Sequence, residues 1–152
     1  MFVCLGNICR SPMAEIIFSD MVAKAGRSDE FIIESSATSN ENVWNGTGAP
    51  VYPPAREILE RHGLSSDGKR AVQLKADDFD KYDMFVCMDR YNVRSVSRIL
   101  RGGDDKIRML MDFTHRPGDV SDPWYTGDFE TAYRDIYEGC EGLLEYFTKP
   151  EG

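Results

Sequence analysis

The sequence predicts an α/β fold in three layers, with a parallel sheet covered by helices on both faces. Short apolar runs alternate along the chain with segments whose apolar residues recur at helical spacing, a pattern typical of strands joined by crossover helices. The runs are apolar at successive positions, as expected for strands buried on both faces. The expected strands are residues 1–3, 31–33, 84–88 and 107–111, and the expected helices are 11–25, 53–62, 93–100 and 129–147.

Local signals mark the helix boundaries. Ser11 is a preferred N-cap residue and Pro12 suits the first helical position, so a helix is expected to begin there. Gly26 is expected to end this helix, because glycine readily adopts the left-handed conformation that follows many helices. In the last helix, Gly139 and Gly142 weaken the helix locally, which indicates close packing against a neighbouring segment.

Length and composition indicate a single globular domain over residues 1–152. Hydrophobic residues make up 41% and charged residues 29% of the chain, which is ordinary for such a domain. The formal net charge of −8 argues against nucleic-acid or anionic-membrane partners, since both require a basic face. The sequence lacks a long apolar span and a signal-peptide pattern, so we expect a cytoplasmic protein. Its cysteines and histidines lack zinc-ligand spacing, so we expect no metal site. The chemistry expected below also needs no cofactor.

The segment from Cys4 to Pro12 is expected to bind phosphate or another oxyanion. Gly6 and Asn7 easily adopt left-handed backbone angles, which turn successive N–H groups inward as an anion-binding nest. The following helix start attracts anions, and the guanidinium of Arg10 matches two phosphate oxygens. Residues expected to surround the anion are Leu5, Gly6, Asn7, Ile8, Cys9 and Ser11.

Cys4 is the expected nucleophile of this loop. The inward N–H groups, the helix start and the charge of Arg10 all favour its thiolate over its thiol. A thiolate next to bound phosphate indicates attack on phosphorus, with transfer of the phosphoryl group to sulfur.

Breaking a phosphate ester also requires a proton donor for the leaving oxygen, and Asp122 is the best candidate. Pro123 restricts Asp122 to an extended conformation, which fixes its carboxyl group on a polar loop. Trp124 and Tyr125 offer flat walls for an aromatic ring, so an aryl phosphate is the expected substrate. Trp44, in a polar segment 37–51 expected to be a surface loop, either adds another wall or pins that loop to the protein body.

Several of these residues follow expected strands. Cys4, Ser35, Asp89 and the loop 112–126 each come after an apolar run. Since right-handed crossovers place the carboxyl ends of parallel strands at one edge, where ligands bind, these segments are expected to converge there.

The string CLGNICRSP resembles the signature of the low-molecular-weight protein tyrosine phosphatases, in which Cys-x5-Arg-Ser encloses Gly-Asn-x-Cys. The resemblance implies a four-stranded, flavodoxin-like sheet and hydrolysis of phosphotyrosine through a phosphocysteine intermediate. In this family the general acid lies in an Asp-Pro pair followed by aromatic residues, which matches Asp122. The first strand is shorter than is usual in the family, so either it is unusually short or the natural start lies upstream.

The resemblance also implies supporting roles. Ser11 would donate its hydroxyl to the thiolate, and Asn7 and Ser35 would form a hydrogen-bonded pair that holds the loop open. Asp89 would support the active-site wall, although a simple cap at the end of a strand is the stronger interpretation of this residue from the sequence.

The remaining cysteines have their own interpretations. Cys9 is either an inert packing residue or the partner of Cys4 in a reversible disulfide, since neighbouring reactive thiols are typical of redox sensors. Cys87 and Cys140 lie in apolar patterns and are expected to be core residues.

Two other functions compete with phosphatase activity. A thioredoxin-coupled arsenate reductase uses a similar loop but needs further cysteines that can reach the first, and a phosphate-binding module does not need both Cys4 and Asp122. The loop around residues 40–48 resembles the bacterial branch of the family. The expected partners are therefore tyrosine-phosphorylated proteins, with a bacterial tyrosine kinase or a capsule-export protein among them.

Overall fold

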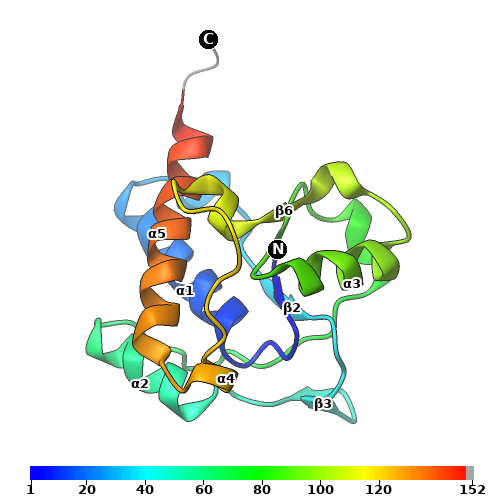
Figure 1. Ribbon diagram of the computed structural model, residues 1–152, viewed down its shortest axis with the longest axis horizontal. Helices are drawn as coiled ribbons and strands as arrows, with labels where there is room; N and C mark the ends of the chain where they lie inside the picture. Colours follow the sequence, from blue (N-terminus) through cyan, green and yellow to red (C-terminus); the bar gives the residue numbers. More distant parts are fainter. Residues whose placement is uncertain (150–152) are drawn as a thin grey trace.

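A computed structural model describes residues 1–149 (Figure 1). Its main sheet has four parallel strands in the order β2-β1-β5-β6. The bounds are Phe2–Cys4 for β1, Ser35–Ala37 for β2, Phe85–Cys87 for β5 and Ile107–Met109 for β6. The predicted parallel, four-stranded sheet is therefore confirmed; residues 150–152 of the predicted domain lie outside the described residues.

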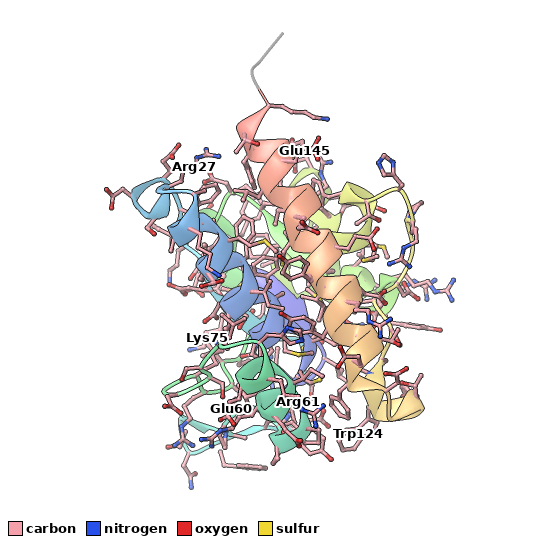
Figure 2. The ribbon with its side chains drawn as sticks, turned by 90° about the vertical axis from the view of Figure 1, so that its left-hand side faces the viewer. Arg27, Glu60, Arg61, Lys75, Trp124 and Glu145 are labelled. Atoms are coloured by element: carbon pink, nitrogen blue, oxygen red, sulfur yellow. The ribbon has the colours of Figure 1, made fainter. Side chains whose placement is uncertain are left out.

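Helices cover both faces of this sheet. On one side α1 (Arg10–Lys24) and α5 (Phe129–Thr148) pack against each other, as Figure 2 shows, and α2 (Pro53–Arg61) lies across their lower ends. On the other side α3 (Arg90–Leu100) packs on β5 and β6. Short 3-10 turns complete the chain: η1 (Ser28–Glu30), η2 (Ala76–Asp80), η3 (Asp104–Lys106) and η4 (Leu110–Phe113).

Strand periodicity divides the core between the two faces. Phe2 and Val86 belong to the cluster formed with α1, α2 and α5, whereas Val3, Phe85 and Cys87 belong to the cluster formed with α3. Successive strand side chains point to opposite faces, so strands this short must be apolar at every position to be buried on both. This explains the continuous apolar runs of the sequence.

The strand predicted at 31–33 is wrong; β2 begins at Ser35, so Ser35 opens this strand and does not follow one as expected. A strand needs a neighbour, and the pairing with β1 starts where Phe2 lies opposite Ser35. Residues 31–33 precede this pairing, and Ile32 is 75% exposed. Phe31 and Ile33 instead pack against the core, and the Phe31 ring lies edge-on to that of Phe18.

The segment 37–51, predicted as a loop, contains a small antiparallel hairpin of β3 (Val43–Trp44) and β4 (Thr47–Gly48). Asn45 and Gly46 join the two strands with φ angles of 51° and 76°. Both angles are positive, as a two-residue turn of type I′ requires, and Asn-Gly is the preferred pair for it. The Asn-Gly pair was therefore a hairpin signal in the sequence.

The predicted helix boundaries hold in part. Gly26 follows α1 with a φ of 70° and ends the helix as expected. The predicted N-cap is wrong: Cys9 occupies that position, and Ser11 and Pro12 lie within the first turn. Proline is tolerated there because the first N–H groups of a helix have no partner within it, and the Ser11 hydroxyl is used elsewhere.

Gly139 and Gly142 mark the close packing that the sequence indicated. A Cβ atom at Gly139 would collide with the Leu110 side chain, and one at Gly142 with the backbone carbonyl of Phe113. Both contacts join α5 to η4, the turn that leads from β6 toward the loop of Asp122.

Replacing Gly142 with alanine is expected to lower the free energy of unfolding by about 1–3 kcal/mol, because backbone rather than a flexible side chain must move. Urea denaturation measures this loss. Glu141→Ala, at the exposed neighbouring position, is the matched control and should leave stability nearly unchanged. Equal midpoints for the two variants would contradict the close packing.

Candidate active site

The Cys4 loop connects β1 to α1 and is held from outside through its carbonyl groups. Four loop carbonyl oxygens accept hydrogen bonds from surrounding segments. In a planar trans peptide the N–H points opposite to the C=O, so the N–H groups that follow these carbonyls face the interior of the loop. The Asn7 N–H indeed donates to the Cys4 Sγ at 3.3 Å. The outer pairs are Thr38 N to Cys4 O (3.0 Å), Ser39 N to Leu5 O (3.0 Å), Asn42 Nδ2 to Gly6 O (3.0 Å) and Tyr52 N to Ile8 O (2.7 Å).

Asn7 is fixed by hydrogen bonds on both ends of its side-chain amide. Its Oδ1 accepts from the Val72 N–H at 2.9 Å, which assigns the other end as the Nδ2 donor. That Nδ2 donates to Ser11 Oγ at 2.7 Å and to Ser35 Oγ at 2.9 Å. The residue has a φ of 54°, in the left-handed region that asparagine tolerates better than most residues. The predicted contact between Asn7 and Ser35 is present.

This arrangement favours one direction for the hydrogen bond between Ser11 and Cys4. The Ser11 Oγ lies 3.0 Å from the Cys4 Sγ. Because the hydroxyl oxygen of Ser11 already accepts a hydrogen from Asn7, its own single hydrogen is left for the sulfur. The geometry thus favours a hydroxyl that donates to a thiolate.

Two residues at the far end of this network were missed by the sequence analysis. Ser35 Oγ donates to Glu15 Oε1 at 2.8 Å, and Glu15 pairs with Lys69 Nζ at 3.1 Å. Glu15 comes four residues after Ser11, one turn along the same face of α1. This spacing could have indicated from the sequence that Glu15 lies near the network. Nothing in the sequence indicated Lys69, which is brought in by the tertiary fold.

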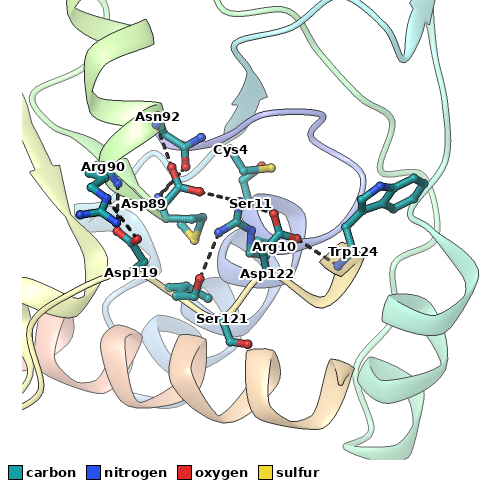
Figure 3. Close-up of polar contacts among 12 residues, drawn as sticks. Cys4, Arg10, Ser11, Asp89, Arg90, Asn92, Asp119, Ser121, Asp122 and Trp124 are labelled. Atoms are coloured by element: carbon teal, nitrogen blue, oxygen red, sulfur yellow. Dashed lines mark hydrogen bonds and ion pairs between the residues drawn. The ribbon is translucent and has the colours of Figure 1, made fainter. Parts of the chain in front are cut away.

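Arg10 lies at the centre of a second group of contacts, shown in Figure 3. Its guanidinium donates to Asp89 Oδ2 at 2.8 Å and to the Val120 carbonyl at 3.1 Å, and it lies 3.4 Å from Asp122 Oδ2. Burial alone would lower the pKa of Arg10, but the charges of Cys4, Asp122 and Asp89 outweigh it and raise the pKa above its ordinary value. Arg10 is therefore a permanent, oriented positive charge.

Asp89 has both of the contacts that the sequence analysis weighed. Its Oδ1 accepts from the Asn92 N–H at 2.8 Å and caps α3, while Asn92 Oδ1 accepts from the Asp89 N–H at 3.1 Å. Its Oδ2 holds Arg10. One buried carboxylate thus joins the start of α3 to the Cys4 loop.

Asp122 lies across Arg10 from Asp89, as Figure 3 shows. It is the N-cap of the short helix α4 (Pro123–Thr126), and its Oδ1 accepts from the Trp124 N–H at 3.0 Å. This leaves Oδ2 facing the guanidinium of Arg10. Arg10 thus brings together an acid and a cysteine that are separated by most of the chain.

A cavity of about 660 Å³ opens beside Arg10 and Asp122, between the start of α3 and the loop before α4. Leu5 and Tyr125 are exposed side chains on its wall. Within residues 1–149, neither Trp44 nor Trp124 lines this cavity.

The two tryptophans lie farther out. Trp44 is 62% exposed on the β3-β4 hairpin, and Trp124 is 69% exposed with its ring 5.7 Å from that of Tyr52. A side chain as exposed as Trp44 does not pin its loop to the protein body, so that interpretation is wrong. A role for either ring in substrate binding stays a prediction.

The other cysteines differ in environment from Cys4. Cys87 and Cys140 are fully buried, which confirms them as core residues. Burial raises the pKa of both thiols. Cys9 is half-buried at the start of α1, where burial, and next the charge of Cys4, raise the pKa of its thiol. These three groups are neutral thiols at pH 7, and a disulfide between Cys9 and Cys4 stays a prediction.

The part of the chain that the structure describes offers no group of three His, Cys, Asp or Glu side chains placed to hold a metal ion. None of the helices within residues 1–149 is both long enough and apolar enough to cross a membrane.

Fold and site together define a class of protein. It is a parallel α/β protein that presents a cysteine in a loop with inward-facing N–H groups at the carboxyl edge of the sheet, where the crossovers from β1 and β5 run to opposite faces. A family model described as low molecular weight phosphotyrosine protein phosphatase matches residues 1–151, and the chain belongs to this family.

Individual relatives agree with this assignment. The low molecular weight protein-tyrosine-phosphatase YfkJ of Bacillus subtilis is 40% identical over 98% of this chain and 95% of its own length. Its crystal structure superposes with a TM-score of 0.91 at 38% identity, covering 99% of this chain and 94% of that one. The Sus scrofa phosphatase is 36% identical over 95% of this chain and 92% of its own. A Drosophila arginine phosphatase has a TM-score of 0.88 at 28% identity, covering 99% and 98%. The predicted resemblance is confirmed.

Asn7→Asp is expected to lower kcat/KM for an aryl phosphate about 10- to 100-fold, the effect of losing a hydrogen bond to a charged group. A carboxylate at this position accepts the Ser11 hydrogen and withdraws it from Cys4. Iodoacetate labelling at pH 7 followed by mass spectrometry should show Cys4 reacting more slowly than in the wild type. Because the raised pKa values keep Cys9, Cys87 and Cys140 protonated at pH 7, labelling at this pH reports on Cys4.

A Ser11→Ala background distinguishes the effect of the added charge on kcat/KM from the effect of the redirected hydrogen bond. In that background Asn7→Asp should have a clearly smaller effect, because there is no hydroxyl to redirect. Asn45→Asp, on the exposed hairpin turn, is the control for an added carboxylate. Equal effects of Asn7→Asp with and without Ser11 would disprove the assigned direction.

Proposed function

We propose that the protein hydrolyses phosphotyrosine in proteins through a phosphocysteine intermediate. The observation that carries this proposal is the position of Arg10, which lies next to the Cys4 loop and contacts Asp122, 3.4 Å away. A phosphoryl group held by the loop N–H groups and by Arg10 has the sulfur of Cys4 on one side. The carboxyl group of Asp122 is then available on the side of the leaving oxygen.

In the first step, the thiolate of Cys4 attacks phosphorus. A sulfur–phosphorus bond forms as the bond between phosphorus and the phenolic oxygen breaks. Asp122 gives its proton to that oxygen, so that tyrosine leaves as a neutral phenol. Arg10 and the loop N–H groups stabilise the charge on the equatorial oxygens, and the loss of one such donor typically costs about 10²–10³ in rate.

In the second step, the same residues release phosphate. The carboxylate of Asp122 takes a proton from a water molecule, whose oxygen attacks phosphorus. The sulfur–phosphorus bond breaks and its electron pair returns to Cys4, where the hydrogen bond from Ser11 stabilises the thiolate. Inorganic phosphate leaves, and the enzyme regains its starting state without a cofactor.

The walls of the cavity favour an aromatic substrate. Leu5 and Tyr125 place exposed apolar surface beside Arg10, where the ring of phosphotyrosine would lie. A serine or threonine side chain is too short to use this surface while its phosphate reaches the loop. We include Trp124 as an outer wall, since it follows Asp122 and Pro123 directly.

Cys4→Ser is expected to abolish turnover of p-nitrophenyl phosphate and the burst of p-nitrophenol that precedes it. Asp122→Ala should keep the burst, because nitrophenolate leaves without a proton, but lower steady-state turnover by about 10²–10⁴-fold. Rapid-mixing absorbance measures both quantities. Turnover by Cys4→Ser would overturn the proposed nucleophile.

The same preparations separate the competing functions. Thiol-coupled reduction of arsenate without hydrolysis of aryl phosphates would favour a reductase. Phosphate binding with no turnover would favour a binding module. Faster hydrolysis of phosphoarginine than of phosphotyrosine would reassign the substrate to the class named for the Drosophila relative.

We place this activity in the cytoplasm, on tyrosine-phosphorylated proteins with a bacterial tyrosine kinase among them. Relatives from Bacillus and Staphylococcus support a bacterial setting. Asp122→Ala with Cys4→Ser should retain phosphotyrosine proteins from a bacterial lysate, and vanadate should release them because it competes for the loop. Retention that vanadate leaves unchanged would contradict binding at this site.

A further inference from the structure

The segment that leads to Asp122 is fixed to a different part of the protein at each of three successive residues. Asp119 Oδ1 accepts from the Arg90 N–H at 3.0 Å, at the start of α3. The Val120 N–H donates to the carbonyl of Met88 at 2.8 Å, and its own carbonyl accepts from Arg10. The third residue, Ser121, is bound by α5.

The contact of Ser121 is made by a buried carboxylate. The Ser121 N–H donates to Asp135 Oδ2 at 3.0 Å, while Asp135 Oδ1 accepts from the Arg116 guanidinium at 3.1 Å. Asp135 is 8% exposed, and a charge this buried is stable only where its oxygens have partners. Arg116 also pairs with Glu138, one turn farther along α5. Figure 3 shows Ser121 next to the α5 ribbon.

The chain has little freedom between this contact and the carboxyl group of Asp122. Asp122 precedes Pro123, which holds it in an extended conformation, with φ −95° and ψ 104°. The Trp124 N–H binds one of its carboxyl oxygens. With Ser121 bound on the other side, the position of the Asp122 backbone relative to Cys4 is set from α5.

We propose that Asp135 is a positioning residue for the proton donor Asp122, acting through the backbone of Ser121. The proposal rests on the proposed function, in which Asp122 protonates the leaving oxygen. Arg116 orients the carboxylate of Asp135 through its hydrogen bond to Oδ1. If Asp135 only supported the fold, its replacement would have no selective effect on proton transfer. The dependence of kcat/KM on the leaving group therefore distinguishes a positioning role from a purely structural one.

The test compares kcat/KM for phenyl phosphate, whose leaving group needs a proton, with that for p-nitrophenyl phosphate, whose leaving group does not. For Asp135→Ala we expect kcat/KM to fall about tenfold or more for phenyl phosphate and less than about threefold for p-nitrophenyl phosphate. The loss on phenyl phosphate is part of the rate enhancement of roughly 10²–10⁴ that positioned proton transfer contributes. Asp135→Asn retains a carbonyl acceptor for the Ser121 N–H and should restore most of the lost rate.

Glu138→Gln is the matched control. Glu138 lies on the same helix and contacts the same Arg116 but makes no hydrogen bond to Ser121, so both substrates should react as with wild type. Thermal unfolding and the affinity for inorganic phosphate verify that the fold and the Cys4 loop are intact. Should Asp135→Ala fail to fold, Asp135→Glu keeps the charge but displaces Ser121, and the same selective loss is expected.

Equal losses on the two substrates, or no loss on either, would overturn the role of Asp135. Asp122→Ala measured alongside distinguishes this result from failure of the proposed function. If Asp122→Ala loses rate selectively on phenyl phosphate while Asp135→Ala does not, only the positioning role is wrong. If Asp122→Ala itself shows no such selectivity, its assignment as proton donor is wrong.

Discussion

The buried guanidinium of Arg10 connects three segments that are far apart in the sequence. It extends from the first residue of α1, is held by the aspartate that follows β5, and binds both a carbonyl and a carboxylate of the segment before α4. A buried cation needs such partners to remain charged, so each contact that stabilises Arg10 also fixes the segment that provides it. The candidate site and the local fold therefore depend on the same interactions.

The parallel sheet makes this arrangement possible. β1 and β5 are neighbours, and their chains continue into α1 on one face and α3 on the other. Their carboxyl ends therefore leave a crevice between two helix starts, where an anion is favoured by both backbone N–H groups and helix dipoles. In this crevice the Cys4 loop supplies N–H groups, and Asp89 holds the guanidinium of Arg10 beside them.

The cysteine itself is surrounded by a network in which each donor has a defined acceptor. The ion pair of Glu15 and Lys69 lies at one end and the sulfur of Cys4 at the other, with Ser35, Asn7 and Ser11 between them. Because the Asn7 amide is fixed by a backbone N–H, the hydroxyl groups have one consistent set of directions. Such a network orients the site before any substrate binds.

The sequence by itself determined the α/β class, and it predicted the chemistry of the Cys4 loop and the candidate acid. Glycine, asparagine and proline act through local backbone preferences, and apolar periodicity records which faces are buried, so both can be recognised within short segments. Tertiary structure alone decided that β2 starts at Ser35, and that the Ser11 hydroxyl binds Asn7 instead of capping α1. It also decided that Lys69 pairs with Glu15 and that Asp135 binds the segment before Asp122. Apart from the contact of Asn7 with Ser11, these features are contacts and strand pairings between residues 14 to 54 positions apart, and their partners are set by how the sheet and helices pack. A local pattern predicts which interactions a residue can form, whereas the packed fold decides which group is its partner.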